Sequence, residues 1–316
     1  MEEQRPLSVG EVFGLVSLES VRQGVRGIRG DSTTPKHQWD LSTLKILKPY
    51  TSIKTWLKFS RTDKRIPIYN YFNRTPVSAS DGYSVRVSQV QDFRGGQNTY
   101  DSHQGTDFVV PVGTPVVSPA AGVVIRVERE FDRGGLCVMM LHKHGLITTH
   151  NHLGRALVQV GQEVQRGVPI ALSGASGLDF VTSFFLSPPH VHFNTWLNGQ
   201  TVDPFAVDGE TPLWLHGNDP KPYHEQTEAT GPLDLESLFD AQAVKVGIDD
   251  CLDPNMRRML NGFGWLPERA AHLIYQRNYR PSKFRSFESV YANNYERTQH
   301  LTLPFHSRDV SGLLLD

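Results

Sequence analysis

The chain has 316 residues, of which 38% are hydrophobic and 21% are charged, a composition typical of a globular protein of one or two domains. Its 32 Lys and Arg residues nearly balance its 33 Asp and Glu residues, and the net charge of −1 argues against nucleic-acid binding through a general positive field. No apolar run reaches the about 18 residues of a transmembrane helix, so no transmembrane segment is expected.

Residues 1–75 have a mixed pattern and are expected to be an N-terminal extension. The first six residues, Met-Glu-Glu-Gln-Arg-Pro, are acidic and are not followed by an apolar core segment, so we do not expect a signal peptide. The extension also contains a locally basic run, and the plainest interpretation of such a run is a solvated surface. Its lysines are Lys45, Lys48, Lys54, Lys58 and Lys64.

The pattern of residues 76–207 predicts short strands separated by turns that contain Gly or Pro. Tyr83, Val85 and Val87 alternate with polar residues, which predicts a half-buried strand at the start of this region. Few helical patterns follow, so the expected core is an antiparallel β fold. Its strands are expected at Phe108–Val110, Thr114–Val117, Val123–Arg129, Cys137–His142, Ile147–His150, Ile170–Leu172 and Val191–Trp196.

Three histidine-bearing motifs lie in this region, at residues 103–107 (His-Gln-Gly-Thr-Asp), 149–153 (Thr-His-Asn-His-Leu) and 189–193 (Pro-His-Val-His-Phe). Positions i and i+2 of a strand point to the same face, so His190 and His192 can share a pocket while Val191 faces a core. His103 and Asp107 are four residues apart and also share a face of an extended strand.

A histidine, a carboxylate and a second histidine provide three ligands for zinc and leave a fourth position for water, as a catalytic site requires. Zinc lowers the pKa of such a water to about 7 in favourable sites. Each motif is weak alone, because a lone histidine is usually a surface or hydrogen-bonded structural residue. His142 and His144, which lie nearby in the sequence, are expected to be residues of that ordinary kind.

After residue 207 the character of the chain changes. Residues 208–232 are rich in Gly, Pro, Asp and Glu and are expected to be a linker. Residues 233–316 are expected to form a small, mostly helical C-terminal domain, which makes the fold α+β overall. Asp253 followed by Pro254 predicts an N-cap and the first residue of a helix, and Pro267–Asn278 predicts another helix. The two cysteines, Cys137 and Cys251, form no Cys-x-x-Cys pair.

From about residue 95 to residue 205 the chain resembles the LytM/lysostaphin-type zinc endopeptidases, which cut peptide bonds in bacterial peptidoglycan. The residues from His103 to Pro115 resemble the family's opening motif and the strand after it, and Ala121-Gly122 resembles the next strand. The later motifs of the family are matched by Leu141–Gly145, Thr149–Leu153, Val160–Ile170, Ser173–Gly177, Pro189–Phe193 and Val202–Pro204.

The resemblance implies a sheet with a substrate groove and a zinc site. Carried over position by position, it makes His103, Asp107 and His192 the zinc ligands, and it makes His152 and His190 the catalytic pair that does not bind metal. One of the pair polarises or deprotonates the zinc water, and the other steadies the oxyanion or protonates the leaving amine. Which histidine takes which part is left open.

The implied function is zinc-dependent hydrolysis of peptide bonds in peptidoglycan stems or cross-bridges. Such a substrate implies a periplasmic or extracellular place of action, which conflicts with the lack of a signal peptide. The basic extension gains a second interpretation, a contact with the anionic cell wall. The C-terminal domain is a candidate for a regulatory or wall-targeting contact.

Three positions depart from the family's usual pattern: His150 stands where tyrosine is frequent, Ser187 where threonine is more usual, and Asn194 where glutamate is common. None is an expected ligand or catalytic histidine, so the departures concern substrate preference and the hydrogen bonds around the site.

Other functions are compatible with parts of the pattern. One is a catalytically silent peptidoglycan-binding or regulatory module, although such relatives typically lack some ligands and all five key residues are present here. Another is a zinc peptidase that acts on a non-wall peptide. The hairpin at residues 160–170 also resembles a lipoyl carrier hairpin, but its turn around Arg166 lacks the lysine that a carrier needs.

Overall fold

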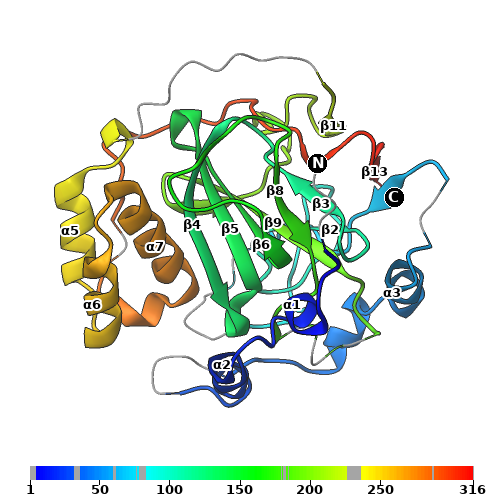
Figure 1. Cartoon of the computed structure of the whole chain (residues 1–316), viewed down its shortest axis with the longest axis horizontal. Helices are drawn as coiled ribbons and strands as arrows, with labels where there is room; N and C mark the ends of the chain where they lie inside the picture. Colours follow the sequence, from blue (N-terminus) through cyan, green and yellow to red (C-terminus); the bar gives the residue numbers. More distant parts are fainter. Residues whose placement is uncertain are drawn as a thin grey trace.

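The computed structural model describes residues 5–31, 36–59, 62–75, 77, 83–178, 180, 183, 185–225, 236–286 and 288–315. A β-sheet occupies the middle of the molecule (Figure 1). Three helices of the C-terminal part lie on one side of it, namely α5 (Ala241–Asp249), α6 (Pro254–Gly262) and α7 (Leu266–Tyr279). Three N-terminal helices lie along the lower and right-hand edges of Figure 1, namely α1 (Val9–Phe13), α2 (Leu18–Arg29) and α3 (Pro49–Trp56).

The sheet has nine strands, and all of their pairings are antiparallel. Its main path runs in the order β10, β9, β6, β5, β4 and β7, with β2 on β9, β8 on β6 and β3 on β8. The expected antiparallel core is therefore confirmed. The strands are β2 (Thr106–Val109), β3 (Pro115–Val117), β4 (Gly122–Glu130), β5 (Gly135–His142), β6 (Ile147–Ala156), β7 (Glu163–Val164), β8 (Pro169–Ser173), β9 (His190–Leu197) and β10 (Gln200–Val202).

Both faces of the central strands are buried, and β5 shows why. Its alternate residues Leu136, Val138 and Met140 belong to one hydrophobic cluster, which contains Phe108, Phe193 and Trp214. The residues between them, Cys137, Met139 and Leu141, belong to a second cluster beneath the helices. A strand covered on both sides has no polar face, which explains the continuous apolar run in its sequence.

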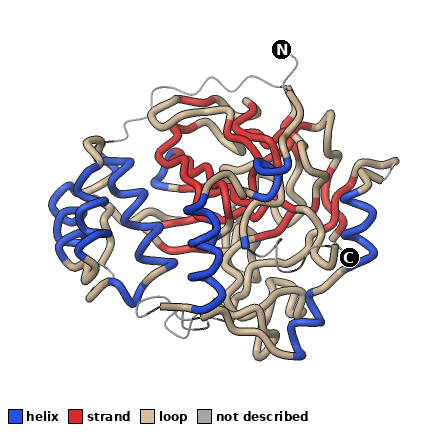
Figure 2. The backbone as a smooth tube through the Cα atoms, turned by 60° about the horizontal axis from the view of Figure 1, so that its bottom comes forward, coloured by secondary structure: helices blue, strands red, loops and turns tan. Residues whose placement is uncertain are grey.

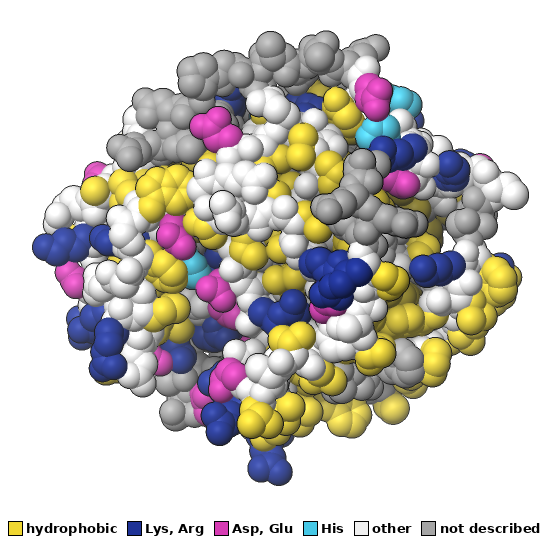
Figure 3. All heavy atoms as spheres, in the orientation of Figure 1, with side chains coloured by type: hydrophobic (Ala, Val, Ile, Leu, Met, Phe, Trp, Pro, Cys, Tyr) yellow, Lys and Arg dark blue, Asp and Glu magenta, His cyan; other side chains and the backbone are white. Residues whose placement is uncertain are grey.

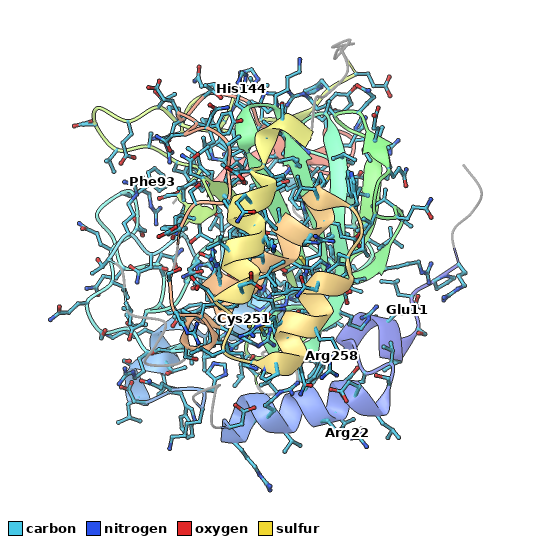
Figure 4. All side chains as sticks on the ribbon, turned by 90° about the vertical axis from the view of Figure 1, so that its left-hand side faces the viewer. Glu11, Arg22, Phe93, His144, Cys251 and Arg258 are labelled. Carbon is cyan, nitrogen blue, oxygen red and sulfur yellow. The ribbon has the colours of Figure 1, made fainter. Side chains whose placement is uncertain are left out.

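The C-terminal helices close the second cluster. Asp253 accepts hydrogen bonds from the backbone of Asn255 and Met256 at the start of α6, and Pro254 is its first residue, so the predicted cap is confirmed. The predicted helix at 267–278 is α7. Figure 4, seen from the left of Figure 1, shows these helices in front of the green strands. None of the described helices combines the length and the apolar composition that a bilayer-spanning helix needs.

Residues of the predicted linker and tail return to the main core. Leu213 and Trp214 are buried in the first cluster, and β11 (Pro222–Tyr223) pairs with β12 (Leu303–His306). β13 (Gly312–Leu314) pairs with β1 (Arg65–Pro67) near the other end of the chain. The division at residues 75, 207 and 232 stays a prediction.

The segment predicted as a strand from Tyr83 to Val87 forms only one bridge, between Ser84 and Gln38. The predicted alternation is not found, since Ser84 and Val87 are buried while Tyr83 and Val85 are only half-buried, and no described strand forms a ladder with this segment. Short 3-10 helices complete the secondary structure and lie at Leu41–Ile46, Phe131–Arg133, Lys143–Gly145, Glu236–Leu238 and Pro281–Lys283.

Candidate metal centre and active site

Two antiparallel strands bring Asp107 and His192 together. Asp107 on β2 is the direct cross-strand partner of His192 on β9, and Val109 is the partner of His190. Because successive side chains of a strand point to opposite faces, His190 and His192 share one face, and Val191 lies fully buried in the core. The predicted placement of the two histidines is confirmed.

His103, from the loop before β2, completes a triangle of donor atoms. Its Nε2 lies 3.1 Å from Oδ1 of Asp107 and 3.1 Å from Nδ1 of His192, and those two atoms are 2.8 Å apart. Within the described part of the chain this is the only group of metal-ligating side chains gathered so closely. The structure therefore contains a buried His/Asp/His site that can hold a metal ion.

Residues from an earlier segment orient two of these donors. His103 Nδ1–H donates to the Tyr71 carbonyl at 2.6 Å, so the lone pair of the neutral ring lies on Nε2. Asn70 Nδ2 donates to Oδ2 of Asp107 at 2.9 Å. The sequence analysis missed both contributions. The one local hint of a buried polar contact in the sequence is the amide of Asn70 among the aromatic residues at 66–72.

The third donor is held by an amide on its own strand. Asn194 is fully buried two residues after His192, with its Nδ2 3.0 Å from His192 Nε2 and 2.7 Å from the Gln104 carbonyl. Its Oδ1 accepts a hydrogen bond from Asn151 Nδ2 at 3.0 Å. The departure from glutamate at this position thus places an amide network, rather than a carboxylate, behind the metal site.

His152 and His190 flank the triangle. His152 lies on β6 with a left-handed φ of 59°, and its Nδ1–H donates to the Ser176 carbonyl at 2.8 Å. His190 Nδ1–H donates to the Pro188 carbonyl at 2.8 Å. The two rings are 4.8 Å apart between centroids, and Phe180 packs against both of them. Each neutral ring therefore carries its lone pair on Nε2.

Burial and mutual contact determine the charges of the cluster. Burial alone would raise the pKa of Asp107, but the charges of His103 and His190, with hydrogen bonds from His103 and His192, hold it well below its usual range. Burial lowers the pKa of His190 and of His192 against the opposing effect of Asp107. A metal ion needs an ionised carboxylate and a ring nitrogen without a proton, and these shifts favour that state for Asp107 and His192.

Two cavities adjoin the cluster. One of about 30 Å³ is lined by His152 and His192. A larger one of about 360 Å³ is lined by His103, and Arg133 and Tyr279 border both. A ligand can therefore approach the His103–Asp107–His192 triangle from this side.

Phe180, in the segment that precedes β9, contacts the site. The aromatic residues Phe180, Phe184 and Phe185 of this segment are compatible with a wall of the groove or with a segment anchored by core aromatics. Phe180 is buried against the two histidines, whereas Phe185 is half exposed. Phe184 lies outside the described residues. The contact of Phe180 agrees with a wall beside His152 and His190.

The other histidines of the region are not part of the cluster. His142 hydrogen-bonds to the Ala121 carbonyl and to Thr148 Oγ1, and His150 is buried with its ring against Phe193. His144 is exposed. The structure thus places none of the three with the metal ligands.

A sequence model described as peptidase family M23 matches residues 101–204. The chain is 39% identical to an uncharacterized metalloprotease of Haemophilus influenzae over 105 residues, which are 33% of this chain and 21% of that protein. It is 39% identical to the peptidoglycan DD-endopeptidase ShyB of Vibrio cholerae over 148 residues, 47% of this chain and 32% of that protein. The chain thus spans less than a third of the length of either relative.

Among solved structures, the chain is similar to a zinc-containing peptidase from Vibrio cholerae. The match has 31% identity and a TM-score of 0.33, and it covers 46% of this chain and 37% of the other.

Proposed function

We propose that this chain, whose residues 101–204 form a peptidase family M23 domain, is a zinc-dependent endopeptidase that hydrolyses peptide bonds in peptidoglycan. The observation that carries the proposal is the buried triangle of His103, Asp107 and His192 with two further histidines beside it. The relatives named as peptidoglycan DD-endopeptidases support the substrate class. The place of action that follows is the cell wall, in the periplasm or outside the cell.

The donor set fits zinc. A tetrahedral zinc ion with bonds of about 2.1 Å needs donor atoms about 3.4 Å apart. The three separations in the cluster, 2.8 to 3.1 Å, are a few tenths shorter and require only a small spreading of the side chains. Two imidazoles and one carboxylate are ligands that zinc prefers, and three protein ligands leave a position for water.

The chain's own residues then supply orientation and proton transfer. A bound zinc ion contributes Lewis acidity and a water molecule of lowered pKa. His152 and His190 each turn Nδ1–H to a backbone carbonyl, so Nε2 is the atom that exchanges protons. One ring takes a proton from the attacking water, and the other, once protonated, donates to the developing oxyanion or to the leaving amine.

The test combines metal content with hydrolysis of purified peptidoglycan, with and without a chelator. We expect one zinc per chain and a chelator-sensitive release of new amino groups. His103→Ala and Asp107→Ala are expected to lose both zinc and activity. His152→Ala and His190→Ala are expected to keep most of the zinc and to lose about 10²–10⁴-fold in turnover.

The exposed His216 provides a matched control, because His216→Ala should change neither quantity. Full zinc in the His192→Ala protein would refute the ligand assignment. Bound zinc without release from any wall type would favour a binding module or a non-wall peptide substrate.

A further inference from the structure

Large apolar side chains are exposed mainly in the N-terminal part of the molecule. Most of the exposed large hydrophobic residues in the described part of the chain lie between residues 9 and 59. Some are almost fully open to solvent, such as Leu18 at 79%, Trp39 at 76% and Leu41 at 85%. A contiguous apolar surface on a protein usually marks an interaction site.

Helix α2 packs on the domain with its small residues and turns its large ones outward. A side chain at Gly24 or Gly27 would meet Phe131 or Leu178 at 3.0 Å or less, so the helix lies directly on these two residues. At about 100° per residue, the side chains of α2 divide into two neighbouring outward sectors. One sector, about 80° wide, carries the aliphatic residues Leu18, Val21, Val25 and Ile28. The other carries Arg22, Arg26 and Arg29. Figure 4 shows Arg22 on the side of α2 away from the sheet.

Helix α3 repeats this inverted arrangement. Its buried residues are Ser52 and Thr55, and Ser52 Oγ donates to the Ser187 carbonyl. Its exposed face carries Tyr50, Ile53 and, just after the helix, Leu57. The 3-10 helix at Leu41–Ile46 has no buried residue and exposes Leu41 and Leu44. Three consecutive helical segments therefore present apolar side chains to the surroundings.

These segments lie on one side of the molecule. In Figure 3 hydrophobic side chains gather along the lower and lower right-hand edge, with Lys and Arg beside them. Figure 1 draws α2 and α3 at that edge. When this side is brought forward, in Figure 2, helices lie in front of the strands. We call this surface, formed by residues 17–59, the N-terminal face.

The charge of the N-terminal face is opposite to that of the rest of the chain. Residues 17–59 contain eight Lys and Arg and three Asp and Glu, a net charge of +5 that leaves −6 for the remaining residues. Lys45, Lys54 and Lys58 are exposed among the apolar residues, and no described residue forms an ion pair with them.

A groove of about 700 Å³ beside α3 extends the same character. Apolar residues such as Ile66, Val110 and Val310 line its floor. The groove has one acidic residue, Asp309, and five cationic residues. The cationic residues are Lys54, Lys58, Lys64, Arg65 and Arg308. Apolar lining with a cationic rim suits an amphiphilic anion.

We propose that the N-terminal face binds the surface of an anionic lipid bilayer. An amphipathic surface with aliphatic and aromatic residues on one stripe and Lys and Arg at its border inserts into the interface of such a membrane. A polyanionic glycan would be bound by the cations alone and would leave the apolar residues in water. A second copy of the chain would bring two faces of +5 together, which disfavours a dimer through this surface.

Sedimentation of the full chain with lipid vesicles tests the proposal. We expect binding to vesicles of phosphatidylcholine mixed with phosphatidylglycerol, little binding to phosphatidylcholine alone, and weaker binding at high salt. Lys54→Gln with Lys58→Gln should weaken binding about 25-fold, or about fivefold for each cation. Leu44→Ser with Leu57→Ser should weaken it at least about tenfold, although no charge changes.

Val246 and Lys245 are exposed on α5 and give a matched control, because Val246→Ser with Lys245→Gln should leave binding unchanged. Failure of the wild-type chain to sediment with anionic vesicles at low salt would overturn the proposal. The proposal would also be overturned if the variant with Leu44→Ser and Leu57→Ser bound anionic vesicles as well as the wild type does. That result would identify the face as a site for a polyanion. Concentration-dependent dimers that the leucine variant abolishes would assign the face to a second copy instead.

Discussion

Asn194 is the residue on which the orientation of the His192 ring depends. Its amide lies 3.0 Å from His192 Nε2 and is anchored by the Gln104 carbonyl. The amide nitrogen is itself a donor, so it does not accept an N–H from the ring; it fixes the position of the ring by contact, and contacts around a metal ligand contribute to metal affinity. We predict that Asn194→Ala lowers the affinity for zinc by about 10–100-fold. Titration of the metal-free protein with zinc measures this directly.

Asn294 is exposed and far along the chain, so Asn294→Ala is the control for that measurement. An Asn194→Ala protein with wild-type zinc affinity would show that the ring is held by its backbone and by Asp107 alone. Thermal unfolding of the metal-free variant separates a loss of affinity from a loss of stability.

At this scale the motifs that resemble the family pointed to five residues, and the structure brings all five together. The shared face of His190 and His192 follows from the two-residue period of side chains along β9 alone. Asn70 and the carbonyl of Tyr71 could not be predicted as partners of the site. They reach Asp107 and His103 from more than 30 residues away, and no periodicity in the sequence encodes that approach.

At the scale of elements, α7 is joined to β4 by a buried ionic network. Arg280 Nη1 lies 2.9 Å from Glu130 Oε2, and Arg280 Nη2 lies 3.3 Å from Asp132 Oδ2. Burial alone would raise the pKa of Glu130, but Arg280 and Arg126 lower it to about 2. We predict that Arg280→Leu destabilises the fold by about 3 kcal/mol, because it leaves buried carboxylates without their cation.

Urea unfolding of the two single variants and of the double variant tests this ionic network. Glu130→Leu should also be destabilising, since Arg126 and Arg280 would lose a shared partner. The double variant should lose less than the sum of the two single losses, because it leaves fewer unpaired charges. Strict additivity would mean that the two side chains do not act as a pair.

Elements were predictable where the pattern is local. The cap at Asp253 and the apolar spacing of α7 need only neighbouring residues, and both were found. Pairing is different because it needs a second strand. The alternation predicted at residues 83–87 is not found, because Ser84 is buried instead of Val85, and Ser84 has a single bridge partner in Gln38.

At the scale of the whole molecule, the arrangement of the flanking segments could not be read from composition. Residues 208–232 have the composition of a linker, but Trp214 is fully buried against Phe193 and Phe108. One tryptophan in a polar stretch is a weak signal, and its burial depends on a cavity that only the folded sheet creates. The same holds for Leu303 and Phe305, which reach the core from the end of the chain.

Buried neutral histidines make the stability of the whole molecule depend on pH. Burial lowers the pKa of His142 and His272 to about 3 and that of His150 to about 4. Between about pH 6.5 and about pH 4 the unfolded chain binds protons at these positions and the folded chain does not, so stability falls as the pH falls. Each group contributes up to about 1.4 kcal/mol per pH unit in that range.

Asp203 acts in the opposite sense, because burial raises its pKa to about 6 and the folded chain then holds a proton that the unfolded chain releases above about pH 4. The stability that Asp203 gains on acidification offsets the loss from about one of the three histidines, so a net loss of stability on acidification remains. Urea unfolding across this pH range should show the free energy of unfolding falling as the pH falls. The His142→Gln variant should lose the part of this pH dependence that one histidine contributes. The variant of an exposed residue, His216→Gln, should keep all of it. A flat profile in the wild type, or the same slope in His142→Gln, would mean that these rings become protonated in the folded state.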